Sequence, residues 1–304
     1  MQDVNKRIIL SKPNGINVLS LFDGISSGMV AFERANIKVD RYVAYEINEH
    51  SIKVSKKNYP MIEHKGDVTQ ADFSEYKDFD ILIGGSPCQD ISNLNIGGKG
   101  LQGEKSGLFY YYLKALKETK PKFFLLENVV GKKEAVEKIS ELLGVQPIMI
   151  DSKLVSAQRR KRYYWTNIPN ITQPKDKNLY LSDVVLPYEQ AKEGWLKEGR
   201  LKWLMGKSGQ QCIKRRFGTI SLTSDLKNTK CQCLTRRSEG SWNCQYINDN
   251  GRIRHLTPIE YERLQTLPDN YTDCIEDKYR YEVLGDGWTV DVIAHIFSLM
   301  KQPK

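Results

Sequence analysis

The sequence lacks the long apolar segment that a membrane-spanning helix needs. No hydrophobic run approaches the roughly 18 residues that cross a bilayer as a helix. The first residues, Met-Gln-Asp-Val-Asn-Lys-Arg, have no apolar signal core behind them. Internal repeats and low-complexity tracts are also absent from the sequence. We therefore expect a cytoplasmic protein with no membrane partner.

Cysteine is scarce, with six residues in 304, and the spacing fits no disulfide framework. Reduced thiols are therefore expected. Cys212, Cys231, Cys233 and Cys244 lie in one segment and could bind zinc. A Cys-x-Cys pair with long, irregular gaps is poor spacing for a zinc site, however, so free thiols are favoured and no metal is expected.

Positive charge is concentrated in one part of the chain. The net formal charge is +9. From residue 170 to 254, 16 Lys and Arg residues face 8 Asp and Glu residues, whereas the rest of the chain has 30 against 29. A basic segment on a nearly neutral body is typical of a module that binds nucleic acid. The alternative is a lysine-rich surface that only confers solubility.

Short apolar runs alternate with amphipathic stretches between residues 16 and 168. The pattern predicts strands at 16–22, 42–45, 79–83, 122–126, 147–150 and 163–167, with helices at 28–35, 49–58, 107–119 and 132–143. This alternation indicates an α/β fold, with a doubly wound, mostly parallel sheet and helices on both faces. In such sheets, ligands bind beyond the carboxyl ends of the strands.

The strand–helix rhythm breaks near residue 170, which suggests three parts. Residues 1–169 would form a catalytic and cofactor-binding domain, and 170–251 a small, irregular second domain. Residues 252–304 would return to the first domain. Helical patterning resumes at Thr257-Pro258, where Thr can cap a helix and Pro can take its first position. A last helix is predicted from near Thr289.

A cysteine stands at the end of one predicted strand, in Gly84-Gly85-Ser86-Pro87-Cys88-Gln89. Pro87 fixes its own φ and biases Ser86 towards extended backbone, so Cys88 lies on a stiff turn. This position suits a nucleophile better than a core thiol. A small apolar residue in an ordinary turn is the alternative.

Three acids follow successive predicted strands. The turn Phe22-Asp23-Gly24 closes the first strand, and its glycine and the next helix can hold a carboxylate. Glu46 ends the second strand, where an acid can accept ribose hydroxyls. Asp67 ends a predicted third strand and could accept from an adenine amino group. Each acid alone would more often be a solvated loop residue. Together they fit a nucleoside that carries an amino-acid carboxylate, such as S-adenosylmethionine.

Two more polar motifs lie at the same predicted edge of the sheet. Glu127-Asn128-Val129 follows a strand, although Glu127 could instead cap the next helix. The basic run 158–162 precedes an aromatic strand. Alternation along extended backbone would place Gln158, Arg160 and Arg162 on one side.

Together these motifs resemble the DNA (cytosine-5)-methyltransferase family. The motif order of that family is matched over most of the chain outside 170–251. The matching motifs are, in order, FDGISSG, a strand-end Glu, GDV, GGSPCQD, ENV, QRRKR and RHLTPIEYERLQTLP. The sequences of these motifs most resemble the catalytic domain of the de novo DNA methyltransferases, as in DRYVAYE, VSAQRRKRYYW and VLGDGWTVDVIAHIF. The resemblance implies a Rossmann-like, class I S-adenosylmethionine-dependent fold. Because few residues precede the first strand, a stand-alone bacterial or phage-type enzyme is expected.

The resemblance also implies a mechanism. The Cys88 thiolate would add to carbon 6 of a cytosine flipped out of a short duplex motif, activating carbon 5 for methylation. A protonated Glu127 would bond ring nitrogen 3, and Arg162 would lie against the base. Arg160 would hold the loop or a phosphate. Water would remove the carbon 5 proton as Cys88 leaves, and the glycine-rich segment after Cys88 would close over the base.

Further site residues are carried over from the family. In the last motif, many family members have Gly-Asn where this chain has Gly-Asp, followed by Gly and Trp288. The de novo branch also has Trp at the position of Trp288. The implied cofactor contacts are Phe22, Asp23, Gly24, Ile25, Ser27, Glu46, Ile47, Asp67, Val68, Pro87 and Trp288. Residues 170–251 correspond to the target recognition domain. The implied contacts with double-stranded DNA, most of them to phosphate, are Gln89, Ser92, Lys214, Arg215, Arg216, Lys227, Lys230, Arg236 and Arg237.

Two other functions compete with this interpretation. An inactive DNA-binding homologue would be expected to lose Cys88, Glu127 or the FDG turn, and this chain keeps all three. A tRNA methyltransferase of the same family would carry a Cys-Phe-Thr tripeptide, which the sequence does not contain. We expect a nucleoid-associated monomer. A dimer and a companion restriction endonuclease are left open.

Overall fold

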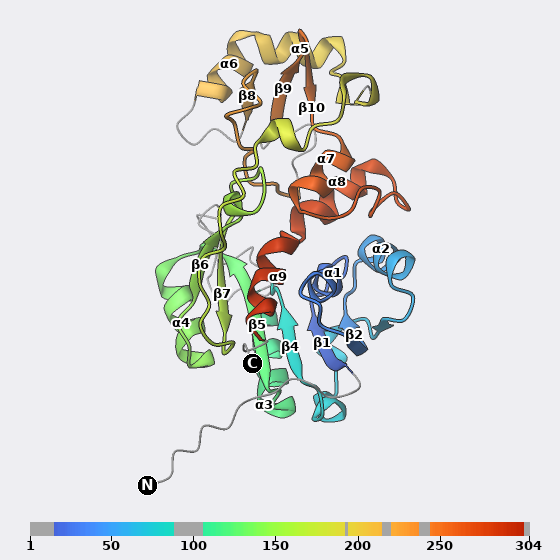
Figure 1. The fold of residues 1–304 in the computed structure, drawn as a ribbon, viewed down its shortest axis with the longest axis vertical. Helices are drawn as coiled ribbons and strands as arrows, with labels where there is room; N and C mark the ends of the chain where they lie inside the picture. Colours follow the sequence, from blue (N-terminus) through green and yellow to red (C-terminus); the bar gives the residue numbers. More distant parts are fainter. Residues whose placement is uncertain (1–14, 88–105, 192–193, 215–219, 237–243, 301–304) are drawn as a thin grey trace.

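The computed structural model describes residues 15–87, 106–191, 194–214, 220–236 and 244–300. Figure 1 shows a large lobe built on one sheet, a small lobe built on another, and helices α7 and α8 between them. Within these ranges, no helix is long and apolar enough to cross a membrane.

The large lobe contains a seven-stranded sheet in the order β3-β2-β1-β4-β5-β7-β6. Only β7 runs against its neighbours, β5 and β6, while the other pairs are parallel. The predicted mostly parallel α/β sheet is therefore confirmed. Its strands are β1 (Ile16–Leu21), β2 (Val39–Tyr45), β3 (Glu63–His64), β4 (Ile81–Gly84), β5 (Phe123–Val129), β6 (Ile148–Asp151) and β7 (Lys161–Thr166).

Helices cover both faces of this sheet, because its central strands are apolar on both sides. The buried cores pack α1, α2 and α9 on one face and α3 and α4 on the other. Helices α1 and α9 meet through Phe32 and Phe297, whose rings stack with centroids 4.1 Å apart. The bounds are α1 (Ser27–Arg34), α2 (Glu49–Asn58), α3 (Phe109–Thr119), α4 (Lys133–Leu143) and α9 (Val290–Ser298).

Two strands differ from their predicted positions in ways that affect the site. Strand β5 continues to Val129, so Glu127 lies inside a strand and does not cap α4, whose N-cap is Lys132. Strand β3 is only two residues long, and Asp67 lies beyond it as the N-cap of a 3-10 turn.

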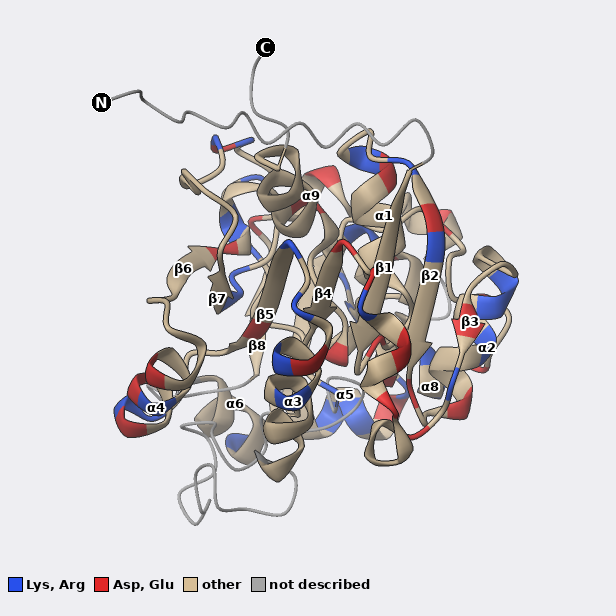
Figure 2. Ribbon diagram, turned by 90° about the horizontal axis from the view of Figure 1, so that it is seen from below, with Lys and Arg blue, Asp and Glu red and all other residues tan. Residues whose placement is uncertain are grey.

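The small lobe is more regular than the sequence suggested. It contains α5 (Glu198–Met205), α6 (Lys207–Lys214), β8 (Ser221–Thr223), β9 (Gln245–Asp249) and β10 (Arg252–His255). Because β10 pairs with β9, the predicted boundary after residue 251 falls inside a hairpin, and the small sheet extends to His255. Figure 2 shows Lys and Arg on α5 and α6, whereas α3 and α4 of the large lobe carry both signs of charge.

The chain returns to the large lobe through α7 (Pro258–Leu264), α8 (Asp277–Asp286) and α9. Thr257 and Glu260 form the capping box of α7, as the Thr-Pro signal predicted. The fully buried Arg254 on β10 contacts Asp249 at 2.9 Å and Glu260 at 2.8 Å. This buried ion cluster fixes the small-lobe hairpin to the start of α7.

Candidate active site

The turn after β1 is shaped by its own acid. Phe22 and Gly24 have left-handed backbone, with φ of 58° and 60°. The Asp23 carboxylate accepts hydrogen bonds from the Ser20 and Tyr42 hydroxyls, both at 2.6 Å, and from Ser26. Burial raises the pKa of Asp23, and these hydroxyl groups partly offset the shift. Asp23 therefore stabilises the turn from inside.

Glu46 joins this turn to the end of β2. Its Oε2 accepts from the Gly24 amide at 2.8 Å, and its Oε1 accepts from the amides of Ile47 and Asn48 at 2.9 and 2.8 Å. A carboxylate has about four acceptor positions, so Glu46 can still accept another hydrogen bond. The Ile47 side chain beside it is 71% exposed.

The third acid lies one strand further along the same edge. Asp67 is exposed and accepts from the Thr69 amide at 2.8 Å, while Val68 beside it is buried. The structure thus places the three predicted cofactor acids after β1, β2 and β3. The remaining predicted contacts of the first turn, Ile25 and Ser27, are buried at the start of α1.

The turn that leads to the predicted nucleophile is braced by Asn128. The Asn128 side-chain amide donates to the Ser86 hydroxyl at 3.1 Å and to the Ser86 carbonyl at 3.3 Å. Both side chains are buried. Asn128 lies in the Glu-Asn-Val motif, but the motif alone predicts no role for it. Pro87 ends this described stretch, and Cys88, Gln89 and Ser92 lie outside the described residues.

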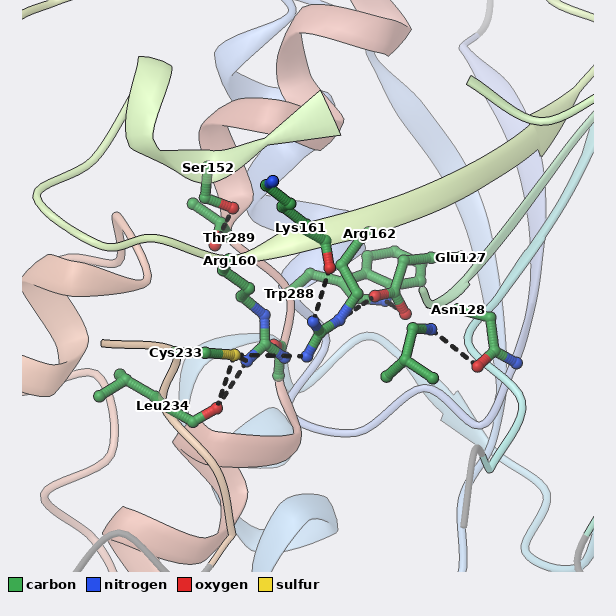
Figure 3. Close-up of polar contacts among 12 residues, drawn as sticks. Glu127, Asn128, Ser152, Arg160, Lys161, Arg162, Cys233, Leu234, Trp288 and Thr289 are labelled. Atoms are coloured by element: carbon green, nitrogen blue, oxygen red, sulfur yellow. Dashed lines mark hydrogen bonds and ion pairs between the residues drawn. The ribbon is translucent and has the colours of Figure 1, made fainter. Parts of the chain in front are cut away.

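Glu127 lies between an ion-pair partner and a hydrogen-bond donor (Figure 3). Arg162 Nε lies 3.0 Å from Glu127 Oε1, and Trp288 Nε1 donates to Oε2 at 3.2 Å. Glu127 is only 8% exposed. A Cβ atom added at Gly85 would lie 3.0 Å from Trp288 Nε1 and 3.1 Å from Glu127 Oε2. The turn before Cys88 therefore passes directly against the Glu127 carboxyl group.

The predicted alternation at 158–162 agrees with the burial pattern. Gln158 and Arg160 are buried, whereas Arg159 and Lys161 are exposed. The Gln158 side-chain oxygen accepts from the Leu234 amide at 2.9 Å. The chain just before β7 is therefore bonded to Leu234, which lies between β8 and β9.

Arg160 connects three parts of the chain. Its guanidinium donates to the carbonyl oxygens of Leu234 at 2.8 Å, Gly287 at 2.9 Å and Gly285 at 3.3 Å. Burial, together with the neighbouring Arg162 charge, lowers the pKa of Arg160. Of the two roles left open by the sequence, these contacts favour holding the loop over binding a phosphate.

Cys233 lies between the two site arginines. Its Sγ is 3.6 Å from Arg160 Nη1 and 3.8 Å from Arg162 Nη2. Burial by itself raises the pKa of the thiol, but the two guanidinium charges bring it below its ordinary value. No sequence pattern indicates this environment, because the arginines are 73 and 71 positions away.

The described cysteines Cys212, Cys231, Cys233, Cys244 and Cys274 are free thiols. Among the described residues, no group of His, Cys, Asp and Glu side chains is arranged to hold a metal ion.

One predicted DNA contact, Lys230, has partners within the protein. Lys230 Nζ donates to the carbonyl oxygens of Lys153 at 2.7 Å and Leu179 at 2.6 Å, and it lies 5.0 Å from the centroid of the Tyr180 ring. Burial lowers its pKa. Lys230 therefore joins segments of the protein, and its N–H groups are used by these carbonyls.

The other predicted DNA contacts are less constrained. Lys227 is exposed. Arg236 is half-exposed and pairs with Glu282 and Asp286, both at 3.2 Å. Lys214 ends α6, and Arg215, Arg216 and Arg237 lie outside the described residues.

A family model for C-5 cytosine-specific DNA methylases matches residues 16–198 and 149–302. The chain belongs to this family. It is 28% identical over 93% of its length to the type II methyltransferase M1.ScrFI of Lactococcus lactis subsp. cremoris, covering 77% of that protein. It is 26% identical to the type II methyltransferase M.NlaX of Neisseria lactamica, covering 93% of this chain and 96% of that one.

The solved structures agree with the fold. The crystal structure of S. pombe Dnmt2 methyltransferase superposes with a TM-score of 0.74 at 19% identity, covering 94% of this chain and 98% of that one. The family match confirms the predicted resemblance, and the superposition confirms the Rossmann-like fold class. The protein is a DNA (cytosine-5)-methyltransferase, and family membership implies DNA as substrate and use of S-adenosylmethionine.

Proposed function

We propose that this methyltransferase acts through a covalent adduct between Cys88 and carbon 6 of a flipped-out cytosine in a short duplex motif. The observation that carries the proposal is the contact at Gly85. There, the turn leading to Cys88 lies against a Glu127 carboxyl group whose two oxygens are held by Arg162 and Trp288. A nucleophile in the chain after β4 and a carboxyl group on the adjacent parallel strand β5 are the pair that this chemistry requires.

The residues at the first three strand ends fit S-adenosylmethionine. Glu46 keeps acceptor capacity for ribose hydroxyls, and the exposed Ile47 offers an apolar surface for a base. A Cβ atom added at Gly24 would meet nothing within 4 Å, so the turn leaves open space above it. When bound there, the cofactor would supply an electrophilic methyl group.

The chain's own residues would perform the remaining steps. The Cys88 thiolate forms a bond to carbon 6, and the electron pair of the 5,6 double bond moves to carbon 5. Glu127 hydrogen-bonds ring nitrogen 3 and stabilises the adduct, while Arg162 lies against the base. After carbon 5 gains the methyl group, a base removes its proton and the bond from carbon 6 to the Cys88 sulfur breaks. Thiolate is thereby regenerated.

The first test is the Cys88→Ala variant. Wild-type protein incubated with duplex DNA and methyl-labelled S-adenosylmethionine is expected to label cytosines in one short motif, located by bisulfite sequencing. The variant should fall to background because no adduct can form, while it still binds the cofactor and DNA. Labelling by the variant would contradict the adduct. Tight DNA binding without any wild-type labelling would favour an inactive DNA-binding homologue.

The basic recognition segment predicts salt-dependent binding. Each neutralised phosphate contributes about −0.9 to the slope of log K against log salt concentration. Lys227→Ala is expected to reduce the magnitude of this slope by about 1 if it contacts a phosphate, as measured by fluorescence anisotropy between low and high salt.

Lys230→Ala is the matched control. Because Lys230 bonds carbonyls within the protein, its loss should lower thermal stability and leave the salt slope unchanged. A binding constant that stays flat over the salt range would contradict the DNA surface itself. A reduced slope with unchanged stability would return Lys230 to the DNA contacts.

We also propose that the protein works as a nucleoid-associated cytoplasmic monomer. The two curated relatives named above are type II methyltransferases, which supports a companion restriction endonuclease of the same target sequence. Size-exclusion chromatography with light scattering tests the monomer. Cleavage of unmodified DNA, and protection of modified DNA, by a cognate endonuclease tests the pairing.

A further inference from the structure

The Glu127 carboxyl group has a separate partner on each oxygen. Arg162 Nε contacts Oε1 at 3.0 Å, and Trp288 Nε1 donates to Oε2 at 3.2 Å (Figure 3). An indole N–H can donate but cannot accept. Trp288 thus donates a hydrogen bond to Oε2, whereas Oε1 is held by an ion pair, so a further group can reach the carboxyl by displacing one of these partners or by sharing an oxygen.

Trp288 is held rigidly on both sides along the chain. The Gly287 carbonyl accepts from Arg160 at 2.9 Å and from the Gln265 side chain at 3.0 Å. The Thr289 hydroxyl donates to the Gln265 side-chain oxygen at 2.9 Å, and Thr289 is buried. The indole therefore reaches Glu127 from a fixed backbone.

Arg162 is held differently. Its Nη1 donates to the carbonyl of Lys161 at 2.8 Å, and its Nη2 lies 3.8 Å from Cys233 Sγ. The guanidinium therefore has two partners besides Glu127. Trp288 has only one N–H, and leaving Glu127 would cost its indole that hydrogen bond. Of the two partners of Glu127, Arg162 is therefore the easier to displace.

The indole also reaches the helix that follows the proposed cofactor turn. A Cβ atom added at Gly28, in the first turn of α1, would lie 3.7 Å from the Trp288 ring. On the other side, a Cβ atom at Gly85 would lie 3.0 Å from Nε1. The ring packs between two glycines, so its apolar body faces α1 while its N–H faces Glu127.

We propose that Trp288 is a positioning residue for Glu127. Because Trp288 holds Oε2, Oε1 is the oxygen that hydrogen-bonds ring nitrogen 3 of the cytosine. The cytosine then takes the place of Arg162 at Oε1. This inference rests on the proposed function and adds a role beyond the cofactor contact expected for Trp288. The ring body would serve the cofactor, and the N–H would serve the catalytic carboxyl group.

Trp288→Phe separates these two roles because it keeps a ring and removes the N–H. A hydrogen bond to a charged group is worth about 1.5–3 kcal/mol, so kcat is expected to fall about tenfold or more. The Kd and KM for S-adenosylmethionine should stay within about twofold of wild type. Trp288→Ala should weaken cofactor binding as well. A wild-type kcat in Trp288→Phe, or a loss confined to the cofactor KM, would overturn the proposal.

A double-mutant cycle tests whether Trp288 acts through Glu127. In a Glu127→Gln background, Trp288→Phe is expected to reduce kcat by much less than in wild type, because the bond it removes is already impaired. Equal fold-losses in both backgrounds would contradict the positioning role. Benzothienylalanine at position 288 replaces only the N–H by sulfur and should reproduce the Trp288→Phe loss if packing is not responsible.

The wild-type assay separates this inference from the proposed function. If wild-type protein transfers no methyl group to cytosine, the proposed function fails. If wild-type protein is active, and if Trp288→Phe and the benzothienylalanine variant both keep its kcat, only the proposed role of Trp288 fails.

Discussion

Glu127→Gln is expected to lower kcat about 10²- to 10⁴-fold at saturating cofactor and DNA, the range over which a positioned acid or base contributes to catalysis. The amide keeps the size of the side chain but cannot form the ion pair with Arg162, which now lies at 3.0 Å. It also cannot supply a proton to the ring nitrogen. Single-turnover methyl transfer measures the chemical step directly, and equilibrium binding measures the cofactor and DNA separately.

Glu137→Gln provides a matched control for charge. Glu137 lies on the exposed surface of α4, where its side chain is 63% exposed and pairs only loosely with Lys133, at 3.6 Å. Its removal deletes the same formal charge and should leave kcat unchanged. The catalytic role of Glu127 would be contradicted if Glu127→Gln kept kcat within about threefold of wild type while both substrates still bound.

The elements of the large sheet were predictable because their signals are local. A parallel strand buried on both faces carries a short continuous apolar run, and β1 and β4 lie close to the predicted positions. Helix α2 has the predicted bounds, since Asn48 caps its first turn and accepts from the Ser51 amide. Asp23 and Glu46 follow β1 and β2 directly, and Glu127 lies near the carboxyl end of β5.

The small lobe was not predictable in the same way. Strand β8 has three residues and pairs with β9, which follows more than twenty residues later. Such short strands have little pattern of their own and depend on distant partners. The hairpin of β9 and β10 therefore crossed a predicted domain boundary.

Side-chain roles were hardest to predict where partners are distant backbone atoms. Lys230 looked like a phosphate contact because it lies in a basic segment, yet its Nζ donates to carbonyls 77 and 51 positions away. Cys233 looked like an ordinary thiol until two arginines were placed beside it. A charge or thiol in a sequence shows its chemistry but not the groups that will surround it.

Arg160→Met is expected to destabilise the protein by about 3 kcal/mol and to reduce methyl transfer as a consequence. The variant fills similar volume but leaves the carbonyl oxygens of Leu234 and Gly285 without their guanidinium donor. Gly287 would keep its bond from Gln265, at 3.0 Å, and so would suffer less. The shift of the urea unfolding midpoint measures the loss of stability.

Arg160→Met also removes a buried charge, which favours the folded state and so limits the expected loss of stability. Arg160 is only 3% exposed, and burial already lowers its pKa, so methionine relieves a desolvation cost. Arg160→Lys distinguishes the two effects, because it keeps the charge but cannot reach three carbonyls with a rigid fork. If fork geometry dominates, lysine should destabilise the protein at least as much as methionine. If charge dominates, lysine should be the milder change.

The exposed neighbour Arg159 controls for position in the chain. Arg159→Met should change stability by no more than about 0.5 kcal/mol, as is usual for a surface substitution. Equal stability of the Arg159→Met and Arg160→Met variants would contradict the bridging role of Arg160. Arg160 bonds the carbonyls of Gly287, which precedes Trp288, and of Leu234, which follows Cys233. Loss of Arg160 should therefore also loosen Trp288, which contacts Glu127, and Cys233, which lies beside Arg162. Methyl transfer by Arg160→Met should then stay reduced even below its unfolding transition.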